Sequence, residues 1–140
     1  MIVPIDLTPF EDAIAHAIED GTVCVVATSG AGGIPDIALK GSVIVYDNEH
    51  LAFWERVRGR QYEQLREGPG IAVLYFNRQR RMLVRFFGEA ELHEAGLIRD
   101  DVLERAPKAE TDRDPERKGL AVLIRVDRVE DPLGAGRQER

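Results

Sequence analysis

Apolar runs broken by polar turns recur along most of the chain, which predicts a mainly β protein. Short runs rich in Val, Ile and aromatic residues are separated by clusters of Gly, Pro, Asn and Asp, and such clusters are typical of turns between strands. A glycine at Lys40-Gly41 interrupts one long run, which favours a bulge or a close approach of backbones there. The predicted strands are 22–28, 34–46, 51–55, 71–76, 83–93 and 120–129.

Apolar residues recur at helical spacing in a few other places. Thr8-Pro9 followed by Glu11 reads as a capping box, and apolar residues then recur at helical intervals until Gly21, which suits a helix end. Shorter helices are expected at 61–67 and 95–105. Six antiparallel strands with two or three peripheral helices fit a small barrel.

The remaining segments show no regular pattern. The charged stretch 107–118 is expected to be a solvated loop, and alternating arginines argue against a cation site at 112–116. The stretch 29–33, SGAGG, is a turn rather than a phosphate loop. The tail 130–140 is expected to be flexible, and the 140 residues suit a single domain, 1–140.

Composition limits the classes of function. A hydrophobic content of 44% is that of a globular protein, and a net charge of −6 argues against general binding of nucleic acid. No apolar run approaches the roughly 20 residues that span a bilayer, and the first residues do not resemble a signal peptide. With one cysteine, no internal disulfide can form. We therefore expect a cytoplasmic protein that does not bind membranes.

The positive charge is concentrated in one region of this acidic chain. Residues 56–85 contain eight arginines against only Glu63 and Glu67, and Lys40 is the only lysine or arginine among the first 55 residues. Lys40 lies inside an apolar strand region, where it either extends its ammonium group to solvent or serves a ligand. Both interpretations remain open from the sequence.

The segment 51–67 carries the clearest candidate for ligand binding. A strand ending on Phe53-Trp54 leads into a loop with Arg58 and Arg60, and a short helix follows. Helix N-termini present free N–H groups to anions, and arginine matches phosphate oxygens with a planar fork. The pattern predicts a phosphate seat beside aromatic residues that can face a flat ring system.

Five local features follow one another between about residue 22 and residue 92: Lys40-Gly41-Ser42, Phe53-Trp54, the loop 58–61, Gly68-Pro69 and the run 87–91. Their order resembles that of a known family, the flavin-binding split β-barrel proteins related to pyridoxamine 5′-phosphate oxidase. The resemblance implies a six-stranded antiparallel split β-barrel of Greek-key topology. It also implies a homodimer with flavin mononucleotide (FMN) at the interface and a small-molecule substrate.

The resemblance assigns roles to particular residues of this chain. Lys40 and Arg60 would meet the phosphate, with Gln61 beside Arg60, and the backbone of Gly41, Ser42 and Val43 would approach the polar edge of the flavin. The implied ring-lining residues are Phe53 and Trp54, and Tyr75 and Arg81 are candidates to reach the site from the partner subunit.

The chain also departs from the family pattern. Gln61 stands where the family commonly has a lysine, and Arg58 is the candidate to replace that charge. The tail, GAGRQER, lacks the tryptophan and the Arg/His-rich end that hold substrate in pyridoxamine phosphate oxidases. Pyridoxamine phosphate oxidase activity itself is therefore not expected.

No other catalytic constellation is legible. The three histidines match no zinc spacing, so no metal site is expected. Cys24 lies in an apolar strand and is expected to be a buried small hydrophobe. Hydride can pass between a substrate and flavin N5 without an ionisable protein group, so no catalytic residue is named.

The function that follows is an FMN-binding oxidoreductase of unknown substrate. Two alternatives remain. The barrel can hold the deazaflavin F420, as some relatives do, and 16 arginines would suit its acidic tail. It can also be a flavin-binding or sensor protein that turns over no substrate.

Overall fold

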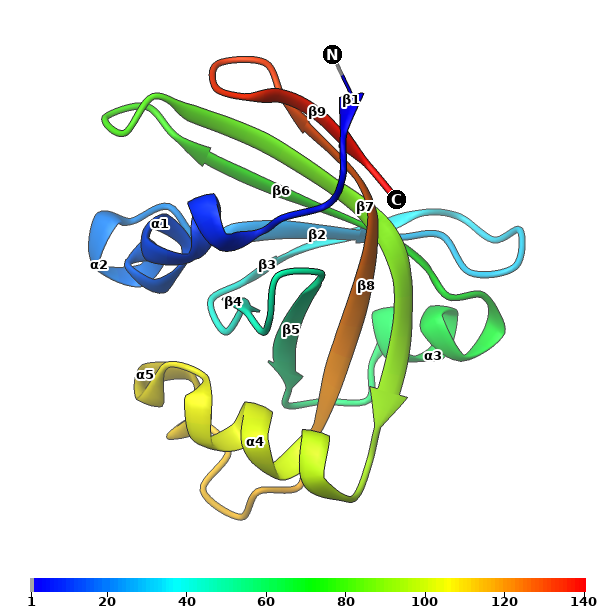
Figure 1. Ribbon diagram of the computed structural model, residues 1–140. Helices are drawn as coiled ribbons and strands as arrows, with labels where there is room; N and C mark the ends of the chain where they lie inside the picture. Colours follow the sequence, from blue (N-terminus) through cyan, green and yellow to red (C-terminus); the bar gives the residue numbers. More distant parts are fainter. Residues whose placement is uncertain (1) are drawn as a thin grey trace.

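One curved nine-stranded sheet forms the body of the protein, and helices cover parts of its surface (Figure 1). The computed structural model describes residues 2–140. The strands are β1 (Ile2–Val3), β2 (Cys24–Thr28), β3 (Asp36–Lys40), β4 (Ile44–Val45), β5 (His50–Glu55), β6 (Gly70–Asn77), β7 (Met82–His93), β8 (Leu120–Asp131) and β9 (Gly136–Glu139). The helices are α1 (Glu11–Ala15), α2 (Ala17–Asp20), α3 (Arg60–Glu67), α4 (Leu97–Arg105) and α5 (Lys108–Thr111), with a 3₁₀ turn at Thr8–Phe10.

The sheet follows the order β1-β9-β8-β7-β6-β2-β3, and β5 pairs with both β8 and β4. Every pair is antiparallel except β1 with β9. The sheet bends so that β3 and β5 approach each other without pairing, which leaves a split in the barrel. The predicted mainly β split barrel is confirmed, and the predicted strand 34–46 is in fact two strands, β3 and β4, separated at 41–43.

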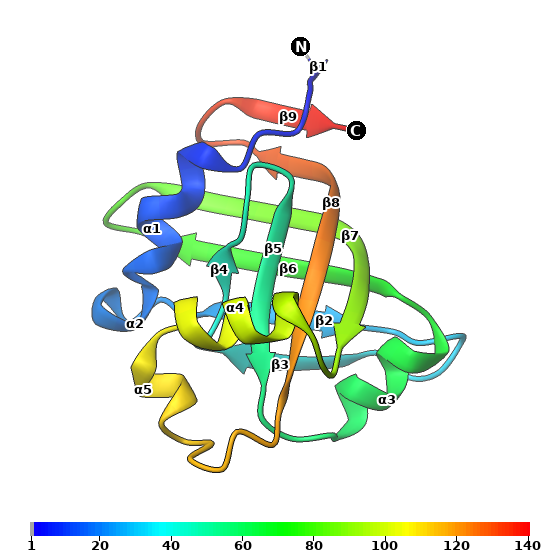
Figure 2. The same cartoon turned by 60° about the horizontal axis from the view of Figure 1, so that its bottom comes forward.

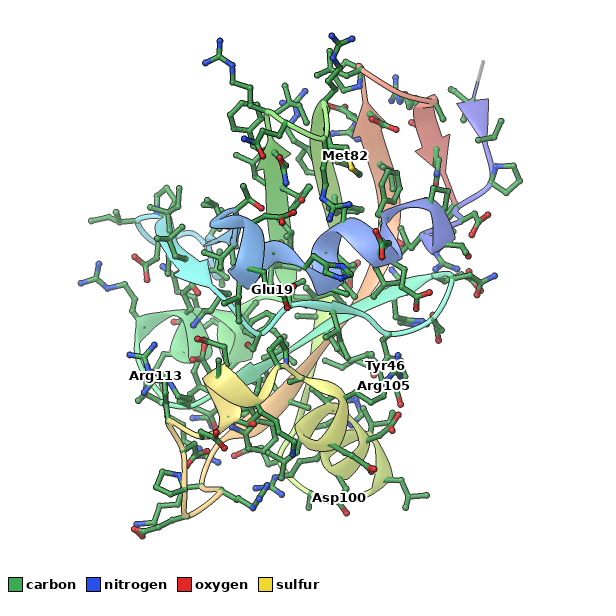
Figure 3. All side chains as sticks on the ribbon, turned by 90° about the vertical axis from the view of Figure 1, so that its left-hand side faces the viewer. Glu19, Tyr46, Met82, Asp100, Arg105 and Arg113 are labelled. Atoms are coloured by element: carbon green, nitrogen blue, oxygen red, sulfur yellow. The ribbon has the colours of Figure 1, made fainter. Side chains whose placement is uncertain are left out.

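Two apolar clusters hold the sheet and the helices together. The larger cluster fills the barrel, where alternate residues of the strands point inward. Its open end is covered by α1, whose Ala13 and Ile14 are buried. The smaller cluster lies between α4 and the outer side of β5 and β8, which α4 crosses in Figure 2. Arg105 of α4 fastens this layer, because its guanidinium stacks 4.8 Å from the Tyr46 ring (Figure 3).

The N-terminal helix differs from its sequence prediction. It is a 3₁₀ turn followed by two short α-helices with a break at His16, and Thr8 makes no capping bond through its side chain. Instead, the backbone N–H of Thr8 donates to Asp6 Oδ1. Gly21 does end the helix in the left-handed conformation, with φ of 71°, as the pattern predicted.

The two segments that showed no pattern also contain regular structure. The stretch 107–118 includes α5, and the tail forms β9, which pairs with β8. Gln138 of β9 is buried, and its side-chain amide both accepts from the N–H and donates to the carbonyl of Asp6. The tail is therefore joined to the N-terminal segment at one end of the sheet (Figure 1).

Candidate functional site

The loop between β5 and α3 carries the arginines that the sequence singled out. Arg58 is held in place: its Nη1 donates to the Lys118 carbonyl at 2.8 Å, and its Nη2 donates to Glu94 Oε1 at 3.1 Å. Its guanidinium also lies 5.6 Å from the ring centroid of Tyr62. The Tyr62 hydroxyl donates to Glu94 Oε2 at 3.1 Å, and the hydrogen bonds from Arg58 and Tyr62 together lower the pKa of Glu94 below its usual range. Arg58 therefore braces the loop, and its charge is already matched.

The first turn of α3 presents unpaired donors. Glu63 is the first residue whose N–H bonds within this turn, to the Gly59 carbonyl at 3.1 Å, so the preceding N–H groups have no helical partner. Gly59 caps the helix without a side chain. Arg60 is exposed, and its guanidinium forms no ion pair or hydrogen bond with any residue from 2 to 140. An anion can therefore meet backbone donors and a free guanidinium here.

Gln61 faces the other way, into the protein. Its side chain is only 5% exposed and its Nε2 donates to the Val26 carbonyl at 2.9 Å. Its Oε1 is buried and has no hydrogen-bond partner among the described residues. A buried acceptor without a donor is costly, so this atom suits a ligand that brings a hydroxyl or N–H group.

Lys40 and Glu55 join the two sides of the split. Lys40 ends β3, Glu55 ends β5, and the ammonium Nζ lies 3.0 and 2.9 Å from the two carboxylate oxygens. Their side chains are 17% and 5% exposed. Nζ also lies 5.5 Å from the ring centroid of Phe53. The lysine is therefore neither extended into solvent nor free to bind an anion in this structure.

The predicted segment 41–43 crosses the split as a connection between β3 and β4. Ser42 is buried, and its Oγ both accepts from the N–H and donates to the carbonyl of Trp54, at 3.1 and 3.0 Å. Val43 is buried in the barrel core. Gly41 lies against Glu110, because a Cβ at this position would come 2.8 Å from the Glu110 carboxyl carbon.

The predicted ring-lining aromatics are both buried. Phe53 is 0% and Trp54 2% exposed. Neighbouring residues of a strand face opposite sides, so Phe53 lies in the barrel core and Trp54 in the cluster under α4. The two predicted ring-lining side chains therefore lie on opposite sides of β5 and not side by side.

The candidates for a contribution from a partner subunit are also placed differently. Tyr75 is 0% exposed, and its hydroxyl donates to the Ala13 carbonyl of α1 at 3.4 Å. Arg81 lies in the exposed turn between β6 and β7 with a positive φ of 56°. Tyr75 supports the end of the barrel and is not available to a ligand, whereas Arg81 is accessible.

Other reactive side chains do not form a site. Cys24 is buried, as predicted, and burial raises the pKa of its thiol to about 12. Residues 2–140 contain no group of three or more His, Cys, Asp or Glu residues arranged to hold a metal ion. In the same range, no helix is both long and apolar enough to cross a membrane.

Sequence reasoning missed the carboxylates around these positions. Asp114, expected in a solvated loop, is buried and accepts hydrogen bonds from Trp54 Nε1 at 2.9 Å and from the N–H groups of Lys118 and Gly119. Desolvation opposes its ionisation, yet these donors lower its pKa overall. For the Lys40 ion pair, the sequence did offer a sign: Glu55 is a carboxylate at the end of the otherwise apolar strand β5, where a cation would be a suitable partner.

Comparison with known proteins agrees with this architecture. Residues 10–130 match the family model described as pyridoxamine 5′-phosphate oxidase. No curated protein matches the chain.

Several solved structures share the fold. HupZ from group A Streptococcus is similar with 24% identity and a TM-score of 0.70, covering 91% of this chain and 94% of its own. A pyridoxamine 5′-phosphate oxidase-related, FMN-binding protein from Nostoc punctiforme has 16% identity, a TM-score of 0.66 and coverage of 95% and 89%. An FMN-binding protein from Syntrophomonas wolfei has 10% identity, a TM-score of 0.64 and coverage of 90% of both chains.

The hydrogen bonds of Asp114 yield a prediction about stability. Asp114→Ala leaves the buried Trp54 N–H without its acceptor, and an unsatisfied buried group costs about 1–3 kcal/mol. We expect the free energy of unfolding to fall by that amount. Urea unfolding can be followed through the fluorescence of Trp54, the single tryptophan of the chain.

Asp112→Ala is the matched control, since Asp112 is exposed in the same segment. It should change the free energy of unfolding by less than about 0.5 kcal/mol. Equal effects of the two variants would mean that the segment behaves as a solvated loop after all.

Proposed function

Because the chain belongs to the pyridoxamine 5′-phosphate oxidase family, we propose that it binds FMN and acts as a flavin-dependent oxidoreductase. Two structurally similar proteins are described as FMN-binding. The observation in this chain that carries the proposal is the first turn of α3. There the free guanidinium of Arg60 and unpaired N–H groups lie at the surface, and the next residue, Gln61, carries a buried acceptor without a partner among the described residues.

The residues of this turn fit the two polar parts of a flavin nucleotide. The phosphate carries a charge of about −1.5 to −2 at pH 7, and it suits the exposed guanidinium of Arg60 and the helix N-terminus. Gln61 Oε1 requires a donor, which an ionised phosphate lacks. The ribityl hydroxyls of the cofactor are donors, so we assign Gln61 to that chain and Arg60 to the phosphate.

A dimer would complete the site. The outward-facing residues Leu39, Val25 and Leu74 are register partners across β3, β2 and β6, and no helix covers this side of the sheet in Figure 1. Leu39 is 69% exposed, and Ile37, which neighbours it on the same face, is also 69% exposed. Contiguous apolar surface of this kind marks an interaction site.

The same face supplies space for a ligand. A hollow of about 380 Å³ lies on it, and its lining includes Ala27, Ala72 and Phe87. We infer a two-fold homodimer in which a second copy covers this face, since isologous contact between identical faces is the commonest arrangement of oligomers.

A bound flavin supplies hydride chemistry, and the chain's part is to hold and orient it. The buried, protonated thiol of Cys24 is a poor nucleophile. Lys40 and Glu55, which face each other across the split, form an ion pair. We therefore assign no protein group to proton transfer, and the substrate class is not assigned either.

The first test of the proposal is cofactor binding. Purified protein incubated with FMN and then desalted should retain a bound flavin with quenched fluorescence. Parallel titration with F420 separates the two cofactors. Tighter binding of F420 would reassign the cofactor within the same fold, and binding of neither would refute the proposal.

Arg60→Ala tests the phosphate assignment. A charge-assisted hydrogen bond is worth about 1.5–3 kcal/mol, or roughly ten- to a hundredfold in affinity. We expect FMN affinity to fall by that factor and riboflavin affinity, which involves no phosphate, to stay nearly the same. Both constants are measurable by flavin fluorescence titration.

Arg66→Ala is the control for Arg60→Ala, because Arg66 is an exposed arginine at the other end of α3. It removes the same charge and should leave both affinities nearly unchanged. Equal losses of FMN and riboflavin in Arg60→Ala would assign Arg60 to folding or to the ring instead of the phosphate.

Leu39→Glu tests the dimer. It places a charge in the centre of the uncovered apolar face, where burying it against a second copy is unfavourable. Light scattering should give twice the chain mass of 15.7 kDa for the parent and the monomer mass for the variant. Leu97→Glu, at an 88% exposed position on α4, should remain dimeric. A monomeric parent that binds flavin tightly would contradict the shared site.

A further inference from the structure

The Lys40–Glu55 ion pair raises a question about the charge of the cofactor site. Both carboxylate oxygens of Glu55 contact the ammonium group, at 3.0 and 2.9 Å, and both side chains are largely withdrawn from water. Charge pairs interact more strongly where water is excluded. A phosphate that used Lys40 would have to displace this carboxylate or lie beside it.

A second carboxylate adds to the negative charge at this end of the site. Glu110 packs against Gly41, the residue that follows Lys40. Its counterion, Arg113, lies 3.8 Å away and is mostly exposed, so water screens that pair. Two carboxylates therefore lie near Lys40, but only that of Glu55 contacts its ammonium group and cancels its charge.

The start of α3 has the opposite character. Arg60 has no carboxylate partner among residues 2–140, and the nearby N–H groups of the first helical turn add positive partial charge. The two ends of the predicted phosphate seat, Lys40 and Arg60, thus differ in charge although both carry a cation in the sequence.

We propose that Glu55 is a specificity-determining residue: it withholds Lys40 from the flavin phosphate, so that the start of α3 binds the phosphate without help from Lys40. This inference rests on the proposed function. Glu55 then weakens the binding of the phosphate, because its carboxylate pairs with Lys40, a second cation that could otherwise contact the phosphate.

The test compares FMN with riboflavin in the full-length protein. The ratio of their dissociation constants isolates the phosphate, and a purely structural change would affect both ligands equally. Glu55→Gln keeps the shape of the side chain and releases the charge of Lys40. We expect it to raise the preference for FMN over riboflavin by about tenfold, the smaller value for one charge-assisted contact.

Lys40→Met should leave the parent's preference for FMN unchanged within about threefold, in contrast to Arg60→Ala. Because Lys40→Met leaves Glu55 buried and unpaired, it can lose stability. The double variant Lys40→Met/Glu55→Gln removes both charges, and it should return the preference to the parent value. Glu110→Gln is the control, since it removes a nearby negative charge without releasing Lys40, and we expect less than a threefold change.

The outcomes separate this inference from the proposed function. If Lys40→Met lowers the preference for FMN as much as Arg60→Ala does, or if Glu55→Gln leaves it unchanged, Lys40 is not withheld and the inference fails while flavin binding stands. If Glu110→Gln matches Glu55→Gln, general repulsion and not the tie to Lys40 sets the preference. If the parent binds neither flavin, the proposed function and this inference fail together.

Discussion

The split between β3 and β5 is the constraint on which the rest of the structure depends. The backbone ladder that joins every other neighbouring pair of long strands is missing there, and side chains replace it. Ser42 Oγ supplies a donor and an acceptor to the backbone of Trp54, and Lys40 meets both oxygens of Glu55. The chain itself also crosses the split at residues 41–43. The barrel is therefore closed at this point both by the backbone connection and by these side-chain contacts.

That closure fixes the elements that follow. Glu55 is the last residue of β5, so its tie to Lys40 sets where the loop toward α3 begins. Arg58 then fastens the loop to Glu94 and to the Lys118 carbonyl. On the other side of β5, Trp54 binds Asp114 and thereby anchors the segment after α5. The end of β5 thus positions two segments: Glu55 fixes the start of the loop toward α3, and Trp54, on the other face of the strand, fixes the segment 107–118.

Short apolar, β-branched runs made most of the fold predictable from sequence, because such runs bounded by turn residues favour strands. In β2, for example, Cys24, Val26 and Thr28 point inward, and the alternate residues Val25 and Ala27 point outward. The strand in the tail could not be predicted in this way, because β9 is short and polar and forms through its pairing with β8. Asp114 was equally invisible, because nothing local shows that Trp54 lies opposite it.

The candidate site was predictable only in part, and for a physical reason. Arg60 and Gln61 lie at a helix start, which local sequence reveals. Their different surroundings, one exposed and one buried with an orphaned acceptor, depend on the packing of α3 against β2. Lys40 is a similar case: the sequence reveals a cation in an apolar strand, but its partner lies 15 residues away on another strand.

The distribution of charge explains how an acidic protein can still bind an anionic cofactor. Most arginines of the described chain contact carboxylates, as Arg58 contacts Glu94 and Arg80 contacts Asp12 and Asp20. Such pairs cancel at a distance, so positive potential remains only where a cation lacks a partner and backbone N–H groups point outward. The start of α3 meets both conditions. Lys40 meets neither, because it is paired with Glu55 and lies at the end of a strand. The position of the carboxylates, more than that of the arginines and lysines, therefore decides where this barrel can hold a phosphate.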